Sequence, residues 1–189
     1  MKAELVLDVK ATLGEGPHWD YRQKLLYWVD IEEKRVCAYN PKTNQNKVYQ
    51  FEQLVGAVIP EKEDSLILAM QHGIHRYDIE NNQLTKLVDP EENKPDNRFN
   101  DAKCDPSGRL WAGTMSLIGE KESGALYRLG PNGRIHKIVS PVSISNGLAW
   151  SPDKKYMYYI DTPTNNVAVY EYDDETGDIQ FEKIAVQIP

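Results

Sequence analysis

The stretch NDAKCDPSGRLWAGTM, residues 100–115, decides the fold because its pattern occurs four times along the chain. A short first segment leads into a turn of Asp, Pro, Ser and Gly, and an apolar strand follows. The same order begins in EGPHWDYRQKLLYWVD at residue 15, VGAVIPEKEDSLILAM at residue 55 and NGLAWSPDKKYMYYID at residue 146. Each copy is followed by a strand that ends near Tyr, a polar turn and a last strand.

The spacing of these copies identifies the architecture. They start at Glu15, Val55, Asn100 and Asn146, in steps of 40, 45 and 46 residues. Short runs of Val, Ile, Tyr and Trp between Gly, Pro, Asn and Asp indicate an all-β protein. A period of about 40–50 residues with four strands per unit is typical of propeller blades. We therefore expect residues 1–189 to form a single β-propeller domain.

Glu15, Asn100 and Asn146 occupy the same position in their repeats. The first strand of a propeller blade lines the central channel, so these three side chains should meet at the axis. Their oxygens suit Ca²⁺, Mg²⁺ or Mn²⁺, and Zn²⁺ also accepts carboxylate. Gly16 and Gly147 would let the backbone approach closely enough to aim the side chains. Taken singly, each residue is better explained as a turn former, but the shared position favours a cation site.

The composition is that of a globular protein, with 40% hydrophobic and 27% charged residues and a net charge of −7. That charge argues against nucleic-acid or anionic membrane partners, which need a basic surface. No apolar run approaches the roughly 18 residues of a membrane span, and Glu4 and Asp8 interrupt the N-terminal run that a secretory signal would need. Cys37 and Cys104 form no CxxC motif and indicate free thiols in the cytoplasm.

Three stretches, LGEGPHWD, RFNDAKCDPSGRLWAGTM and ISNGLAWSPDKKYMYYIDT, resemble the gluconolactonase / regucalcin (senescence marker protein) / luciferin-regenerating enzyme family. The resemblance follows nearly the whole chain in order. It implies a six-bladed propeller with one divalent metal on its axis, which hydrolyses sugar lactones or related esters.

The resemblance also implies roles for single residues. Glu15 and Asn146 would be metal ligands, and Arg98 and Asn100 would face a small lactone or sugar-acid substrate beside the metal. The repeat position makes Asn100 a candidate ligand as well. Glu120 matches the family residue that contacts substrate hydroxyls.

One family residue has no counterpart in this sequence. The family's last ligand, an Asp that is also its expected general base, lies in a PDG-type motif opening the next blade. The repeat spacing puts that motif shortly after Pro189, whereas Asp161 closes a second strand. We therefore assign no general base within the chain, and expect about four of six blades in a sequence that is apparently truncated at its C-terminal end.

Two functions follow from these residues. In the first, a metal polarises the lactone carbonyl and activates water, while Arg98 binds substrate oxygens through its planar guanidinium. Arg98 could instead offset the charges of Asp96, Glu91 and Glu92 in its loop. The second function is a non-catalytic calcium-binding or interaction propeller, which the missing base favours.

The sequence also leaves two shapes open. Four blades could close into a small ring, with residues 3–9 as a strand on the outer edge of the last blade. Alternatively, they form an open arc whose exposed apolar faces favour self-association. We also expect Trp19, Trp28, Trp111 and Trp150 to pack between blades, with Trp19 and Trp150 at equivalent repeat positions.

Overall fold

The computed structural model describes residues 2–189, which form sixteen β-strands in four sheets and one short 3₁₀ helix, η1 (Thr162–Thr164). Each sheet has four strands, joined antiparallel in chain order. We call the sheets blades 1 to 4. No helix in this part of the chain could span a lipid bilayer.

Blade 1 contains β1 (Gly14–Asp20), β2 (Leu25–Asp30), β3 (Arg35–Asn40) and β4 (Gln45–Gln50), and blade 2 contains β5 (Val55–Lys62), β6 (Ser65–Met70), β7 (Gly73–Asp78) and β8 (Gln83–Val88). Blade 3 contains β9 (Asn97–Cys104), β10 (Leu110–Ser116), β11 (Gly124–Leu129) and β12 (Ile135–Val142), and blade 4 contains β13 (Ser145–Trp150), β14 (Tyr156–Asp161), β15 (Asn166–Tyr172) and β16 (Ile179–Gln187). The predicted all-β propeller of four-stranded blades is confirmed.

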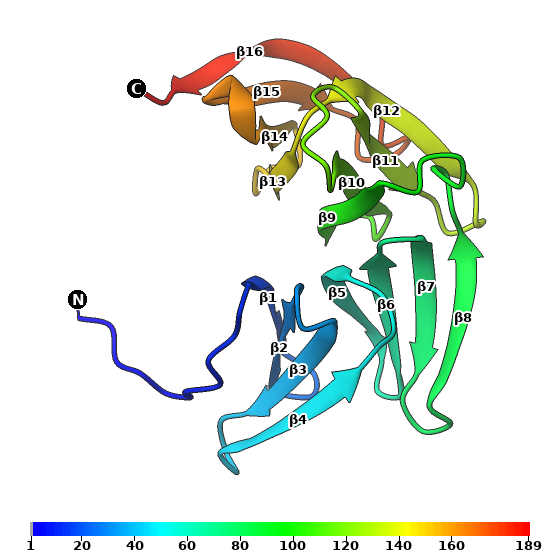
Figure 1. The fold of residues 1–189 in the computed structure, drawn as a ribbon. Coiled ribbons are helices and arrows are strands. Elements are labelled where there is room, and N and C mark those ends of the chain that lie inside the picture. The colour runs from blue at the N-terminus through cyan, green and yellow to red at the C-terminus, as the bar shows by residue number, and fades with distance from the viewer. Residues whose placement is uncertain (1) are drawn as a thin grey trace.

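The four blades stand side by side in an open arc, with β1, β5, β9 and β13 on its inner side (Figure 1). The two chain ends lie at the two ends of the arc. A closed four-bladed ring is therefore not formed, and residues 3–9 form no strand and lie apart from β16. The side-chain layers between blades set the rotation from each blade to the next, and at this rotation four blades do not complete a circle.

A middle blade is buried on both faces, which explains why its strands are apolar along their length. In β6, Leu66, Leu68 and Met70 pack into the cluster shared with blade 1. Ile67 and Ala69, which alternate with them, pack into the cluster shared with blade 3. Because successive side chains of a strand point to opposite faces, a run such as SLILAM supplies both layers at once.

The end blades lack a neighbouring blade on one side, and two tryptophans at equivalent positions differ in their packing as a result. Trp150 packs edge-to-face against Trp111 between blades 3 and 4, with ring centroids 5.8 Å apart. Trp19, at the equivalent position of blade 1, keeps 47% of its surface exposed. The expectation that both pack between blades is thus correct for Trp150 and wrong for Trp19, because no blade covers that side of blade 1 in residues 2–189.

The inner strand of every blade carries a β-bulge at the same place. The register shifts lie between Glu15 and His18 in β1, Val55 and Ala57 in β5, Phe99 and Ala102 in β9, and Asn146 and Leu148 in β13. A bulge adds one residue to a strand, bends it and redirects a side chain. Gly16 and Gly147 adopt positive φ angles of 57° and 70° there, a conformation that favours glycine.

Gly56, in the bulge of β5, sets the distance between blades 2 and 3. A Cβ atom at this position would lie 2.3 Å from the carbonyl oxygen of Phe99 and 2.6 Å from that of Asn100. Because both contacts are to backbone, a side chain there can be accommodated only by moving one blade away from the other.

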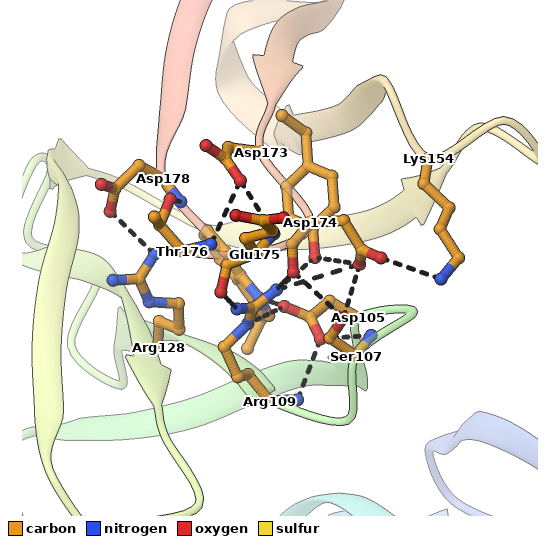
Figure 2. Close-up of polar contacts among 12 residues, drawn as sticks. Asp105, Ser107, Arg109, Arg128, Lys154, Asp173, Asp174, Glu175, Thr176 and Asp178 are labelled. Atoms are coloured by element: carbon orange, nitrogen blue, oxygen red, sulfur yellow. Dashed lines mark hydrogen bonds and ion pairs between the residues drawn. The ribbon is translucent and has the colours of Figure 1, made fainter.

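Buried Arg109, which directly precedes β10, joins blade 3 to the loop between β15 and β16 (Figure 2). Its Nε donates to Asp105 Oδ2 at 2.6 Å, and Nη2 donates to the Tyr172 hydroxyl at 2.7 Å. Nη2 and Nη1 donate to the carbonyl oxygens of Asp174 and Glu175, at 2.7 and 2.9 Å. One guanidinium therefore fixes blade 4 against blade 3.

We predict that Gly56→Ala lowers the free energy of unfolding by about 1–3 kcal/mol, the usual cost of overpacking. The measurement is urea unfolding followed by tryptophan fluorescence. Gly130→Ala is the matched control, since its Cβ would lie 3.1 Å from the side-chain Oδ1 of Asn132 and at an ordinary contact distance of 3.7 Å from backbone, at the Arg134 carbonyl oxygen. Equal stability of Gly56→Ala and the unsubstituted chain would contradict this account of blade spacing.

We also predict that Arg109→Met lowers the free energy of unfolding by about 3–5 kcal/mol, because it leaves the fully buried Asp105 carboxylate without its cation. Lys154→Met removes the half-exposed Lys154–Asp174 ion pair and should cost less than about 1 kcal/mol. Guanidinium chloride unfolding of both variants gives the comparison, and similar losses would show that Arg109 is no more important than a surface ion pair.

Candidate functional site

The bulges bring the three predicted axial residues together. Glu15, Asn100 and Asn146 line one cavity of about 10 Å³ at the inner side of the arc. A cavity of this volume is just large enough for one water molecule. The other residues that line the cavity are Gly16, Ile31, Gly56 and Asp101. Side chains separated by up to 131 positions in the sequence thus meet at one point of the fold.

Hydrogen bonds on both sides orient the Asn100 amide. Its Nδ2 donates to the Ser145 carbonyl oxygen of blade 4 at 2.9 Å, and its Oδ1 accepts from Arg98 Nη1 at 2.7 Å. Since an amide oxygen has two lone pairs, Oδ1 can still accept a further partner. Asn100 is therefore fixed by the protein and retains capacity to bind.

Arg98 is a buried cation behind Asn100, with 7% of its surface exposed. Burial lowers the pKa of the guanidinium, and the negative charges of Glu15 and Glu32 oppose this effect. Arginine nevertheless stays charged in proteins. Nη1 donates to the Phe99 carbonyl oxygen at 2.9 Å as well as to Asn100. The structure thus holds a positive charge close enough to Glu15 to interact with it.

The loop acids do not account for Arg98. Glu91 is buried and accepts hydrogen bonds from Asn97 Nδ2 at 2.9 Å, Thr114 Oγ1 at 3.1 Å and the Tyr127 hydroxyl at 2.9 Å. Its one ion pair within residues 2–189 is with Lys94, at 3.8 Å. Glu91 therefore anchors the segment that leads into β9, and through Asn97 it fixes the residue next to Arg98.

Two aspartates hold the segments that lead to Glu15 and Asn146. Asp30, at the end of β2, accepts from the backbone N–H groups of Thr12 and Leu13 at 3.2 and 2.9 Å. Asp161, at the end of β14, accepts from those of Ser143 and Ile144 at 3.0 and 2.7 Å. The two are equivalent in the repeat, and each ties the chain entering an inner strand to the neighbouring strand of the same blade.

Asp101 also lines the cavity, although the sequence pattern gave it no role. Its Oδ2 accepts from the Gly147 N–H of blade 4 at 3.0 Å, and its Oδ1 accepts from the Ala102 N–H at 2.9 Å. The signal that could have identified it is its place in the repeat, since the residue that follows the first position is glycine in the other three copies.

Glu120 lies elsewhere, in the exposed loop between β10 and β11. Its backbone N–H donates to Ser116 Oγ at 3.1 Å. It does not line the cavity shared by Glu15, Asn100 and Asn146. Contact of Glu120 with substrate hydroxyls therefore stays a prediction.

The general base expected after Pro189 has no position in this structure. β16 ends at Gln187, and Pro189 is the last residue of the chain, at the outer end of the arc (Figure 1). An Asp in a PDG-type motif that follows Pro189 would thus lie outside the described residues, and its role stays a prediction. Asp161 does not replace it, because both of its carboxylate oxygens already accept backbone N–H groups at the end of β14.

The donor set fits a hard divalent cation. Glu15 brings a carboxylate to the cavity lining, and Asn100 and Asn146 bring neutral amides. Carboxylate and amide oxygens are ligands that Ca²⁺, Mg²⁺ and Mn²⁺ prefer. Within residues 2–189, no three His, Cys, Asp or Glu side chains are grouped so that they could hold a metal. Glu15, Asn100 and Asn146 would thus be incomplete as a ligand shell and would leave positions open for water or substrate.

Comparison with known proteins gives a consistent result. Residues 13–189 match the family model described as SMP-30/Gluconolactonase/LRE-like region. The chain is 43% identical over 179 residues to the provisionally assigned sugar lactone lactonase YvrE of Bacillus subtilis, covering 95% of this chain and 61% of that protein. It is 37% identical over 182 residues to regucalcin of Xenopus laevis, and the match covers 94% of this chain and 61% of that protein.

Two solved structures share the fold along nearly the whole chain. A luciferin-regenerating enzyme superposes with a TM-score of 0.90 at 33% identity, covering 94% of this chain and 62% of that one. A calcium-binding protein, regucalcin, from Agrobacterium tumefaciens superposes with a TM-score of 0.89 at 28% identity, covering 96% and 61%. The chain thus spans about three fifths of the length of these relatives.

The hydrogen bonds of Asp30 predict a pH dependence. Burial alone would raise its pKa, but donation from Leu13 N–H, Arg35 and Thr12 N–H holds the pKa below its ordinary value of 3.8. Because the folded-state pKa is the lower one, the carboxylate stabilises the fold fully above the unfolded-state value. This contribution is lost as the pH falls through the folded-state pKa.

We therefore predict that Asp30→Asn lowers the free energy of unfolding at pH 7 by about 2 kcal/mol and flattens its decline below about pH 4. Urea unfolding between pH 7 and pH 3 measures both effects. Glu80→Gln, on the exposed turn after β7, is the control. The interpretation would be wrong if the free energy of unfolding fell with decreasing pH in the same way for Asp30→Asn and Glu80→Gln.

Proposed function

The chain belongs to the SMP-30/gluconolactonase/LRE-like family, and from this premise we propose that a propeller containing these four blades hydrolyses a sugar lactone with a bound divalent cation. The observation that carries the proposal is the meeting of Glu15, Asn100 and Asn146 in one oxygen-lined cavity. The lactonase name of the Bacillus subtilis relative supports the substrate class. The calcium-binding description of the Agrobacterium tumefaciens regucalcin supports a cation.

Glu15, Asn146 and Asn100 would hold the cation. When bound, such a cation polarises a carbonyl group and lowers the pKa of a coordinated water. Glu15 supplies the one formal negative charge among the three donors, and the two amides add oxygen donors without charge. A site with so little negative charge leaves a cation electrophilic.

Arg98 and Asn100 would bind the substrate beside that position. All side-chain hydrogen bonds that Arg98 donates within residues 2–189 come from Nη1. Its Nε and Nη2 groups therefore remain available to substrate oxygens, and the planar guanidinium suits paired contacts with them. A fixed positive charge would also stabilise the negative charge that develops on the lactone oxygen. Glu120 is a further candidate for contact with substrate hydroxyls.

The general base is not assigned to Asp101. Each of its oxygens already accepts a backbone N–H, from Ala102 and from Gly147, so the carboxylate serves to hold the backbone of blades 3 and 4. We keep the prediction that an Asp from a blade following Pro189 supplies the base in a longer protein.

A non-catalytic calcium-binding or interaction propeller is the second candidate. The observation that favours it is the cavity lining, in which Glu15 and Asp101 are the acidic residues among residues 2–189, and both oxygens of Asp101 accept backbone N–H groups. Cation binding without turnover would be the result that distinguishes this function from a lactonase. In either case the substrate or partner proposed is a small molecule, and the cytoplasm is the proposed location.

We predict that Glu15→Gln weakens Ca²⁺ and Mn²⁺ binding by at least about tenfold, because it removes the one charged donor among the three proposed ligands. Isothermal titration calorimetry of the 189-residue chain gives the affinity. Glu32→Gln, an exposed acid that also faces Arg98, is the control and should stay within about threefold of the unsubstituted chain.

The same substitution tests the reaction. Proton release from gluconolactone, with Ca²⁺, Zn²⁺ or Mn²⁺ present, is measured on this chain and on any longer protein that contains it. Turnover that requires both the cation and Glu15 would support the lactonase proposal. Cation binding that depends on Glu15, without lactone turnover in either protein, would favour the calcium-binding alternative. Cation binding that Glu15→Gln leaves unchanged would overturn both proposed functions.

A further inference from the structure

We infer that Asp101 is a positioning residue that, together with Asn100, clamps the backbone on both sides of Asn146. Asn100 Nδ2 donates to the carbonyl oxygen of Ser145 at 2.9 Å. Asp101 Oδ2 accepts from the N–H of Gly147 at 3.0 Å. These polar groups belong to the residues immediately before and after Asn146. Two adjacent side chains of β9 therefore hold β13 at the point where Asn146 enters the cavity, and the two strands are neighbours on the inner side of the arc (Figure 1).

The Asp101 side chain is itself held in place. Its second oxygen accepts from the Ala102 N–H at 2.9 Å, which fixes the carboxylate against its own strand. The β9 bulge contributes the extra residues Asn100 and Asp101 opposite Gly113 of β10. Because a bulge bends the strand, both side chains can reach blade 4 from consecutive positions.

The residue before Asn146 is also fixed from a second side. Ser145 is fully buried, and its Oγ accepts from the Tyr159 hydroxyl at 2.8 Å. A Cβ atom on Gly113 would lie 1.7 Å from this Oγ, so Ser145 packs directly against the backbone of β10. With Ser145 held here and Gly147 held by Asp101, Asn146 has little freedom to turn away from the cavity.

The other blades show that the bulge itself does not need an aspartate. The position that Asp101 occupies is Gly16, Gly56 or Gly147 in the other copies. Gly56 is required because the Phe99 and Asn100 carbonyl oxygens lie too close for a side chain. At Asp101 the facing group is instead the N–H of Gly147, and the carboxylate reaches it. The departure from glycine thus coincides with the blade boundary that carries Asn146.

This inference deepens the proposed function, because its value to the protein rests on Asn146 being a cation ligand. Groups that orient metal ligands commonly change metal affinity by about 10- to 100-fold when they are removed. The clamp itself, in contrast, is a property of the cation-free protein and can be measured there.

The test compares Asp101→Ala, Asp101→Asn and the control Asp173→Ala in the 189-residue chain. Asp173 also accepts two backbone N–H groups, from Glu175 and Thr176 at 2.8 and 3.1 Å, but lies in the loop after β15. Hydrogen exchange of the Gly147 amide, followed by NMR without added metal, reports on the clamp. Calorimetry with Ca²⁺ alone reports on its consequence, and thermal unfolding confirms that each variant is folded.

Asp101→Ala should accelerate Gly147 exchange about tenfold, as expected for one lost hydrogen bond, and weaken Ca²⁺ binding about 10- to 100-fold. Asp101→Asn keeps one acceptor oxygen, which can serve the Gly147 N–H but leaves the Ala102 N–H without its partner, and should lie between the unsubstituted chain and Asp101→Ala in both properties. Asp173→Ala should change neither. Unchanged Gly147 exchange in Asp101→Ala would overturn the inference, and so would an Asp101→Asn variant as weak as Asp101→Ala, because the charge would then be what matters.

The two proposals fail in different ways. If the unsubstituted chain binds no Ca²⁺ while Asp101→Ala still accelerates Gly147 exchange, the clamp is supported and the cation site is not. If Ca²⁺ binding depends on Glu15, but Asp101→Ala changes neither Gly147 exchange nor Ca²⁺ affinity, the cation site is supported and the clamp is refuted.

Discussion

The close approach of the inner strands to one another is the constraint on which the rest of this structure depends. Gly56 lies so near the carbonyl oxygens of Phe99 and Asn100 that no side chain fits, and Gly113 of β10 packs against the Ser145 side chain of β13. These close contacts of glycine with the neighbouring blade set the spacing between blades. Because packed interiors resist even small changes of volume, this spacing is held closely.

The site is a consequence of that spacing. Each inner strand bends at a bulge, and the first position of three repeats contributes Glu15, Asn100 and Asn146 to one cavity. Hydrogen bonds then fix these side chains within and across blades. Asp30 holds the segment before Glu15, Arg98 and the Ser145 carbonyl oxygen orient Asn100, and blade 3 grips the backbone around Asn146. The polar groups thus depend on the glycine contacts that bring the blades together.

In the open arc all blades share one strand pattern, but the burial of their faces depends on whether a neighbouring blade is present. Blades 2 and 3 bury both faces, and their alternating side chains supply two core layers. Blade 1 has the same strand pattern, yet Trp19 remains half exposed because nothing in residues 2–189 packs on that side. Self-association through such faces stays a prediction, since relatives with the same fold are longer than this chain.

The sequence by itself determined the blade repeat, the all-β fold and the shared position of Glu15, Asn100 and Asn146, because strand alternation and turn residues are local properties that recur with the period. Only the tertiary structure decided that the arc is open, that Arg98 is buried against Asn100, and that Asp101 bonds to Gly147. These features depend on the rotation between blades and on contacts between residues far apart in the chain. No pattern within one repeat specifies either of them.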